Sequence, residues 1–357
     1  MINGIYYQTI YLLILIFFSI SCYSQYKQNY SIVDKPKAAF IYALFLALFI
    51  GLRPYLDVLT DTVGLSYYYN AHKGFDFIFS MDVENPLFDN FLLFMASKGL
   101  DFSWFLTIMS TIYFIGRYIA LKKLFPSHVW AAYLLFLASF ITYTSSVNGF
   151  KAGAAASFFC IAIAYRKKWV LTLLFLVLSI TTHHSIIVCA VGFLITTFYK
   201  NTKIYMVGWL VALALALLHV KYFQVLFGGV AGDKGASYLL SENGAWMTGM
   251  RYDFVLYSAM PIILGWYLLF KKKIQIDETY QFILNLYIIV NTVWLLCMYA
   301  NFTNRIAALS WFMYSIVLGY PFLSEGNIGQ FIEKNRTFSI IFAIHLSFTA
   351  FMTFIYY

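Results

Sequence analysis

The sequence predicts an all-α, polytopic integral membrane protein with about twelve transmembrane helices in a single transmembrane domain, residues 1–357. The first observation is composition, because 62% of the residues are hydrophobic and only 11% are charged, as in a chain embedded in a bilayer. The second is a set of six short runs of lysine and arginine that separate long apolar stretches. Glycines, prolines or isolated polar groups interrupt each stretch near its middle, so each is expected to cross the membrane and return.

The basic runs also predict the side of the membrane on which each loop lies, because short loops rich in lysine and arginine face the cytoplasm. The six runs are Lys27/Lys35/Lys37, Arg117/Lys122/Lys123, Arg166/Lys167/Lys168, Lys200/Lys203, Lys271/Lys272/Lys273 and Lys334/Arg336. They hold 16 of the 24 basic residues, whereas 10 of the 15 acidic residues fall on the opposite, outer side. The net charge of +9 therefore reflects the topology. The sequence contains no basic stripe of the kind that would indicate nucleic-acid binding.

The twelve predicted spans follow from this division, and both termini are expected outside. In chain order they are about residues 5–22, 38–52, 102–118, 129–147, 150–165, 169–183, 185–199, 204–219, 251–270, 280–301, 305–323 and 337–356. The first is interpreted as a retained helix, because no lysine or arginine precedes it. The four cysteines are isolated in or beside apolar runs, which indicates packing and neither a disulfide nor a metal site.

Two outer segments are long enough to hold structure. Within residues 53–101, the run Pro86–Met95 is apolar, too short to span, and flanked by Glu84 and Lys98. We expect it to form an amphipathic helix on the outer membrane surface. Residues 221–250 carry a glycine-rich run without the Gly-Lys-Ser/Thr of a phosphate loop, and they are expected to form an external loop that acts as a lid.

The central spans are short. Lys168 and Lys200 both face inward and leave 31 residues for two crossings and the turn His183-His184-Ser185. Fifteen helical residues reach about 22 Å, against a hydrocarbon core of about 30 Å. The turn is therefore expected below the outer surface, in a cavity lined by protein, where irregular backbone is tolerated.

Isolated charges near helix ends collect on the predicted outer side, and this convergence indicates a functional site. An ionisable group at membrane depth costs about 2.5–3.5 kcal/mol on insertion scales unless it faces a partner or a cavity. These residues are Arg53, Asp57, Asp61, Lys151, His183, His184, Arg251, Asp253 and Arg305.

Structural interpretations of the same charges stay open. Arg53 and Arg251 could be interfacial anchors, the two histidines could cap a helix, and Arg305 could pair with an acid such as Asp61. Lys151 lies among small residues, which permit close helix packing but also leave room for an anion beside a helix start.

Several short motifs follow one another along the chain. They are Gly51-Leu52-Arg53, Asp61-Thr62 followed by Tyr67-Tyr68-Tyr69 and Phe75, Glu84–Phe88, Asn148–Ala154, His183-His184-Ser185 and Asn304-Arg305. Over about residues 38–320 they resemble motifs of the EpsG-type exopolysaccharide polymerases, relatives of the Wzy-type O-antigen polymerases, in which the third to fifth read "EPGF", "RQxLA" and "HxS". Lysine replaces the family's usual arginine at 151, and the usual Val-Gly before the acid is missing, so either Asp57 or Asp61 could fill the motif's role.

The resemblance implies a GT-C-like architecture and a polyprenyl-diphosphate-dependent glycosyltransferase. Such an enzyme joins undecaprenyl-pyrophosphate-linked oligosaccharide repeats into O-antigen, capsule or exopolysaccharide on the periplasmic, outer face of the bacterial inner membrane. An acceptor hydroxyl attacks the anomeric carbon of a lipid-linked chain, and lipid pyrophosphate leaves. The reaction needs cations for the leaving group and a base for the hydroxyl.

These needs assign the candidate residues. Guanidinium groups bind phosphate bidentately, so Arg53, Arg251 and Arg305 are assigned to pyrophosphate, with Lys151 as a point-charge helper. His183 is the first choice for the base, and Asp61 is its orienter or substitute.

No metal or other cofactor is expected, because neither an HExxH motif, nor a cysteine pair, nor a DxD-type pair is found. A chain-length regulator and a flippase of the same pathway are candidate partners. Two alternatives remain: a lipid-linked oligosaccharide flippase or transporter, and an O-antigen ligase. A carrier typically shows an internal repeat and ionisable residues at the bilayer midplane, whereas the ligase uses the same donor chemistry and is harder to separate.

Overall fold

The computed structural model describes residues 3–4, 6–27, 35–55, 59–228, 237, 239–240, 249–325 and 334–356. Within these ranges every regular element is helical, which confirms the predicted all-α class. The chain forms two compact units. The first comprises Met1–Ile186 with Phe322–Glu325 and Gly329–Tyr357, and the second comprises Ile187–Pro321 with Gly326–Ile328.

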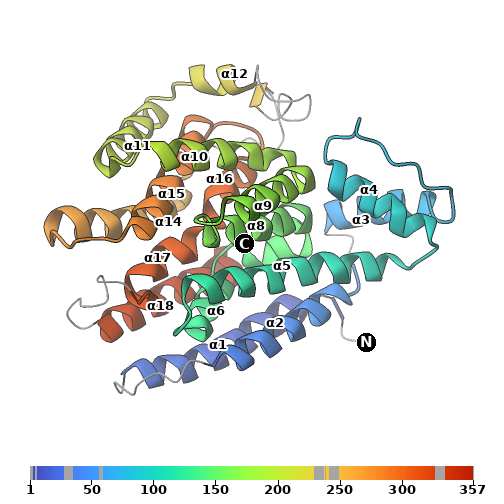
Figure 1. Ribbon diagram of the computed structural model, residues 1–357, viewed down its shortest axis with the longest axis horizontal. Helices are drawn as coiled ribbons and strands as arrows, with labels where there is room; N and C mark the ends of the chain where they lie inside the picture. The colour runs from blue at the N-terminus through green and yellow to red at the C-terminus, as the bar shows by residue number, and fades with distance from the viewer. Residues whose placement is uncertain are drawn as a thin grey trace. The chain divides into compact units, whose positions relative to one another are not determined.

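The first unit is built around one long helix. Its elements are α1 (Tyr6–Lys27), α2 (Pro36–Gly51), α3 (Thr60–Ala71), α4 (Pro86–Ser97), α5 (Phe102–Leu124), α6 (Val129–Leu137), α7 (Thr142–Val147), α8 (Phe150–Ala164), α9 (Trp169–Thr182), the 3₁₀ turn η1 (His184–Ile186), α18 (Lys334–Phe351) and the π-helical turn η4 (Met352–Tyr356). Helix α5 packs against both α2 and α8, and α9 packs against α8 (Figure 1).

Gly51 permits the close approach of α2 to α5. A Cβ atom at this position would lie 2.5 Å from the Cα atom of Thr107 in α5, which is closer than two such atoms can approach. The glycine at the end of α2 therefore brings the next residues, including Arg53, against the helical bundle.

The predicted span 129–147 is broken, which corrects the expectation of one continuous helix. Helices α6 and α7 are separated by residues 138–141. Side chains from other helices satisfy the freed carbonyls: the Tyr11 hydroxyl donates to Leu137 O at 2.6 Å, and the Thr349 hydroxyl donates to Ala138 O at 2.6 Å. Irregular backbone within a membrane protein is tolerated where such donors are present.

The helix predicted at 102–118 extends to Leu124, and Arg117, counted in a basic run, is buried inside the bundle. It belongs to α5 and is 1% exposed. Its Nη1 donates to the Sγ of Cys160 in α8 at 2.6 Å, and its guanidinium lies 5.1 Å from the centroid of the Phe136 ring. Arg117 therefore joins helices within the first unit, while Lys122 and Lys123 occupy the last turn of α5.

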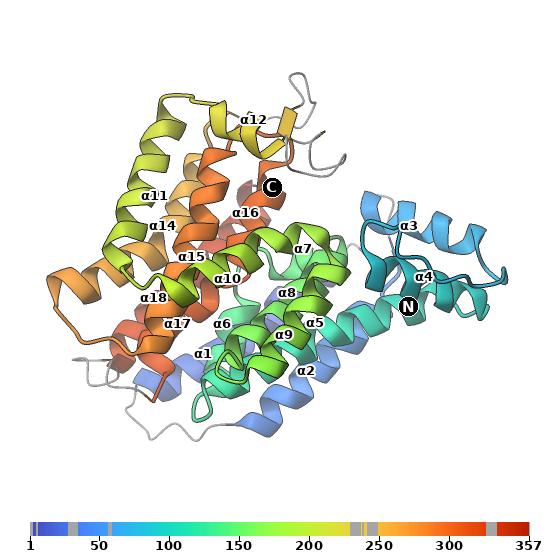
Figure 2. The same cartoon turned by 45° about the horizontal axis from the view of Figure 1, so that its top comes forward.

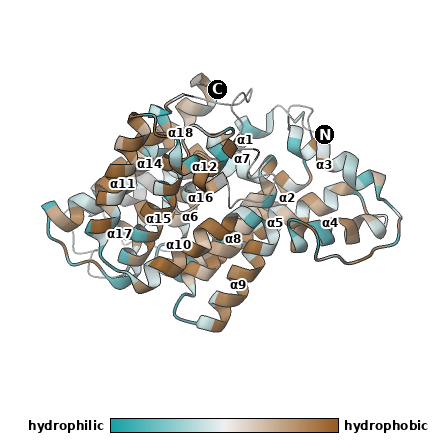
Figure 3. Ribbon diagram, turned by 90° about the horizontal axis from the view of Figure 1, so that it is seen from above, coloured by the Kyte–Doolittle hydropathy of each residue, from teal (hydrophilic) through white to brown (hydrophobic). Residues whose placement is uncertain are grey.

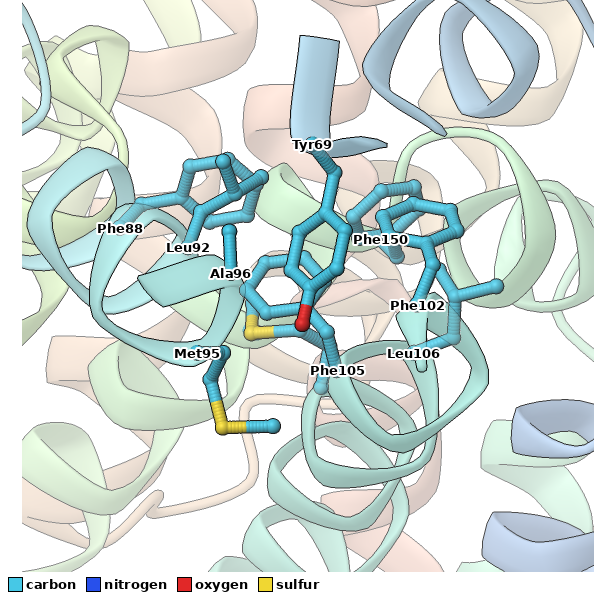
Figure 4. Close-up of a cluster of buried hydrophobic side chains, with 11 residues drawn as sticks. Tyr69, Phe88, Leu92, Met95, Ala96, Phe102, Phe105, Leu106 and Phe150 are labelled. Atoms are coloured by element: carbon cyan, nitrogen blue, oxygen red, sulfur yellow. The ribbon is translucent and has the colours of Figure 1, made fainter. Parts of the chain in front are cut away.

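Segment 53–101, which is predicted to lie outside, contains two helices, α3 and α4, beside the N-terminal end of α5 (Figure 2). A helix is present at the predicted position, as α4, and its place on the outer membrane surface stays a prediction. Helix α3 was not anticipated from the sequence. The apolar side of α4 is buried in a cluster of side chains from α3, α4, α5 and α8 (Figure 4). The cluster contains Tyr69, Phe88, Leu92, Met95, Ala96, Phe102, Phe105, Leu106, Met109, Phe150 and Ala154. It fixes α3 and α4 to the membrane helices.

The second unit is arranged around α15. Its elements are α10 (Ile187–Phe198), α11 (Thr202–Leu217), α12 (Tyr222–Gly228), α14 (Tyr252–Trp266), the π-helical turn η2 (Tyr267–Lys271), α15 (Glu278–Leu296), α16 (Thr303–Trp311) and α17 (Tyr314–Leu323). Helices α10, α11, α14 and α16 all contact α15. A chain of buried hydrogen bonds links α11, α15 and α16. Trp209 Nε1 donates to Asn291 Oδ1 at 2.7 Å, and Asn291 Nδ2 donates to Ser310 Oγ at 2.9 Å. Most of the predicted external loop 221–250 lies outside the described residues.

Several helices are suited to cross a membrane. By length and composition, five in the described ranges are long and apolar enough: Phe102–Leu124, Tyr252–Lys271, Glu278–Leu296, Thr303–Leu323 and Arg336–Ile355. Shorter apolar helices are Tyr6–Cys22, Pro36–Gly51, Phe150–Ala164, Trp169–Thr182, His184–Phe198 and Thr202–Leu217. Figure 3 colours α8 and α9 almost wholly hydrophobic, whereas α3 carries hydrophilic residues. The chain is a multi-pass membrane protein; the number of twelve spans and the GT-C-like architecture stay predictions.

Candidate functional site

Five segments of the first unit that carry the sequence motifs are joined by direct contacts. They are the end of α2, the start of α3, the start of α4, the link between α7 and α8, and the turn after α9. Four of the six predicted site residues lie in these segments: Arg53, Asp61, Lys151 and His183. The contacts show what each motif residue does locally.

Arg53 is buried beside the link between α7 and α8. It is 3% exposed. Its Nη1 donates to Ile50 O at the end of α2 at 2.8 Å, and its Nη2 donates to Val147 O at the end of α7. Its Nε has no hydrogen-bond partner within the described part of the chain. Burial lowers the pKa of the Arg53 guanidinium to about 10, so the group remains protonated at neutral pH.

Asp61 and Thr62 contact the same link from the start of α3. The Thr62 hydroxyl donates to Val147 O at 2.8 Å. Asn148 Nδ2 donates to Asp61 Oδ2 over a longer distance of 3.4 Å. Asp61 is exposed, whereas Thr62 is buried. Asp57, the alternative acid of the motif, lies outside the described residues.

Lys151 lies in the first turn of α8, half-buried. Its Nζ is 5.0 Å from the centroid of the Phe88 ring in α4. Gly153 permits the tight entry into α8, since a Cβ atom there would lie 2.5 Å from Ser145 O in α7. The N-terminus of a helix of this length carries a partial positive charge. Lys151 and this helix start therefore make a positive region.

The histidine turn is held by Asn85, the residue that precedes α4. His183 ends α9 with extended backbone, and its ring nitrogens lie 3.3–3.4 Å from Ser185 Oγ. The backbone N–H of His184 donates to Asn85 Oδ1 at 2.9 Å. Asn85 is 2% exposed and precedes Pro86, the first residue of α4. The side chain of Asn85 thus connects segment 53–101 to the turn that carries His183.

The structure brings the four residues into one connected region of the first unit. Arg53 and Asp61 both reach residues 147–148, and Lys151 follows them in α8. Phe88 of α4 contacts Lys151, and Asn85, the residue before α4, contacts the histidine turn. Asp61, Lys151 and His183 retain exposed surface, whereas Arg53 does not. The accessible groups are therefore a carboxylate, an ammonium group and an imidazole, which together can attract an anion and accept a proton.

Arg251 and Arg305 belong to the second unit. Arg251 precedes α14 and forms two hydrogen bonds with the Asp253 carboxylate, at 2.9 Å and 2.6 Å. Its guanidinium lies 3.6 Å from the centroid of the Phe254 ring. Arg305 is exposed in the first turn of α16, 4.7 Å from the centroid of the Phe302 ring. Phe302 has a φ of 54°, a left-handed conformation that is unusual for a bulky residue.

Two residues with clear roles in the region were not selected from the sequence: Thr62 and Asn85. Thr62 follows Asp61, and Asn85 lies between Glu84 and Pro86. Their positions inside two of the sequence motifs could have indicated a role. Within the described ranges, no three His, Cys, Asp or Glu side chains gather in a group that could hold a metal ion.

Comparison with known proteins gave one match. The sequence model of the EpsG family matches residues 37–357, which include all six predicted site residues. No curated protein and no solved structure matches the chain.

Proposed function

The chain belongs to the EpsG family of polysaccharide polymerases, and from that premise we propose that it joins oligosaccharide repeats carried on undecaprenyl pyrophosphate. The proposed reaction takes place on the outer face of a bacterial inner membrane and yields O-antigen, capsule or exopolysaccharide. The observation that carries the proposal is the family match over residues 37–357. The contacts among the motif segments of the first unit support it.

The chemistry is a glycosyl transfer. The oxygen of an acceptor sugar hydroxyl forms a bond to the anomeric carbon of a lipid-linked chain, and the bond between that carbon and the pyrophosphate oxygen breaks. The hydroxyl proton passes to a base, and the lipid pyrophosphate leaves with the bonding electrons. A base for the hydroxyl and cations for the leaving group are the two demands on the protein.

His183 is the proposed base, and Asp61 is its orienter or its substitute. A neutral imidazole has an unperturbed pKa near neutrality and can accept a proton at physiological pH. The Asn85 side chain holds the backbone of the turn at His184, next to His183, and the His183 ring lies beside Ser185 Oγ. A fixed backbone at this turn supports a defined imidazole position, which proton transfer needs.

Lys151 and the start of α8 are the proposed binding site for the anionic leaving group. The ammonium group and the N–H groups of a helix start both favour an anion.

The assignment of Arg251 and Arg305 to pyrophosphate is a separate proposal that rests on the sequence. Arg305→Lys keeps the charge but removes the planar fork, so it should lower polymerisation if Arg305 binds bidentately; full activity with lysine would contradict bidentate binding.

Surface glycan from a deletion strain tests the function. Loss of the long ladder on a gel, with a single repeat unit retained, would support a polymerase. Loss of all exported glycan would instead favour a lipid-linked oligosaccharide flippase or transporter. Long chains that remain on the lipid carrier and do not reach their final acceptor would favour a ligase. Complementation with the wild-type chain is the control.

A chain-length regulator and a flippase of the same pathway are proposed partners.

A further inference from the structure

The carbonyl of Val147 receives two side-chain donors from segments far away in the sequence. Val147 is the last residue of α7 and is buried. Arg53 Nη2 donates to its oxygen, and so does the Thr62 hydroxyl at 2.8 Å. A carbonyl oxygen has two lone pairs, so these two donors fill its capacity.

Arg53 also joins the ends of two helices. Its Nη1 donates to Ile50 O near the end of α2, while its Nη2 reaches the end of α7. The C-terminal end of a helix carries unpaired carbonyls and a partial negative charge. These carbonyls offset the burial of the guanidinium, for which no carboxylate partner is found among the described residues.

The link held in this way leads directly to the candidate site. Asn148, the next residue, contacts Asp61, and Lys151 lies three residues further on in the first turn of α8. Thr62 is the neighbour of Asp61 in α3. Movement of Val147 would therefore displace Asn148, Asp61 and the start of α8 together.

We propose that Arg53 and Thr62 are positioning residues, which hold the link between α7 and α8 through the shared Val147 carbonyl and thereby set the geometry of Asp61 and Lys151. Their effect on polymerisation rests on the proposed function, whereas their hold on the link does not. This role departs from the sequence-based assignment of Arg53 to pyrophosphate. The Arg53 side chain is 3% exposed, and both of its terminal nitrogens donate to backbone carbonyls. An anion would therefore have to enter the protein interior to reach the remaining N–H groups of the guanidinium.

Hydrogen–deuterium exchange of the full-length protein in lipid nanodiscs tests the hold on the link. The variants are Thr62→Val, which removes the hydroxyl at nearly constant volume, Thr62→Ser, which keeps it, and Arg53→Lys. Thr60→Val is the matched control, because Thr60 is an exposed residue in the first turn of the same helix. We expect exchange of the amides in residues 147–152 to rise about fivefold in Thr62→Val, the factor that corresponds to one net hydrogen bond.

The pattern across variants decides between positioning and direct binding. If both residues act by positioning, Arg53→Lys and Thr62→Val should each raise amide exchange at residues 147–152. Each should also shorten the glycan ladder in a complemented deletion strain. The effect of the double variant on the ladder should be smaller than the sum of the two single effects. Thr62→Ser and Thr60→Val should resemble the wild type. A normal ladder in Thr62→Val with a lost ladder in Arg53→Lys would overturn the proposal in favour of direct anion binding by Arg53.

Two further results have defined meanings. Exchange that rises throughout the first unit in Thr62→Val would also overturn the proposal, since the contact would then be a general stability element. If amide exchange changes as expected but the deletion strain makes a normal glycan ladder, the positioning contact is supported and the proposed function is contradicted.

Discussion

At the scale of single residues, the hydrogen bond from His184 to Asn85 gives the first prediction. Asn85→Leu removes the acceptor for the His184 N–H, and the loss of one such hydrogen bond costs about 0.5–1.5 kcal/mol. We expect faster amide exchange at residues 183–186 and slower polymerisation at unchanged protein level. Asn85→Asp keeps an acceptor oxygen and is the conservative control. Equal effects of the two substitutions would show that the hydrogen bond to His184 is not the relevant contact.

At the same scale, the sequence predicts which residues are charged but not which groups they contact. Arg53, Asp61, Lys151 and His183 could be selected because isolated ionisable groups in an apolar chain are costly. Thr62 and Asn85 were missed, because neutral polar residues cost much less to bury when hydrogen-bonded. The sequence also could not distinguish a buried arginine that donates to carbonyls from an exposed one. That distinction depends on Val147, which is 94 positions away from Arg53.

At the scale of elements, most helices could be predicted from apolar runs between basic clusters, as for α9 and α10. The break between α6 and α7 could not, because residues 138–141 resemble their apolar neighbours in composition. The break depends on Tyr11 from α1 and Thr349 from α18, which donate to the freed carbonyls. Helix α3 was missed for a related reason: it is polar, and its place is fixed by contacts of Tyr69 and Thr62 rather than by its own pattern.

The broken helix gives the element-scale prediction. Tyr11→Phe keeps the ring and removes the donor to Leu137 O, so it should lower stability by about 1–3 kcal/mol, measured by thermal unfolding in detergent. Tyr6→Phe is the control, because Tyr6 lies on the same helix but is exposed. An unchanged unfolding temperature in Tyr11→Phe would mean that water or another donor satisfies this carbonyl.

At the scale of the whole molecule, the charge pattern predicts the topology, whereas the division into two units follows from long-range packing. Helix α18, at the C-terminal end of the chain, packs in the first unit, where the Thr349 hydroxyl donates to Ala138 O. No local sequence pattern predicts this packing.

The predicted topology can be tested directly. A reporter that works only outside the cytoplasm should be active after Glu84 and inactive after Lys122, Lys168 or Lys272. Activity after Lys168 would place the histidine turn on the inner side and contradict the proposed site.

The most direct test of the central claim is polymerisation by the purified full-length protein supplied with a synthetic undecaprenyl-pyrophosphate-linked repeat, with chain length measured on a gel. The wild type should produce a ladder, also in the presence of a chelator. His183→Ala should leave single repeats, since loss of a general base typically lowers the rate about 10²–10⁴-fold. His184→Ala should be mild, because its contact to Asn85 uses the backbone N–H. A normal ladder from both His183→Ala and Asp61→Asn would contradict the proposed mechanism.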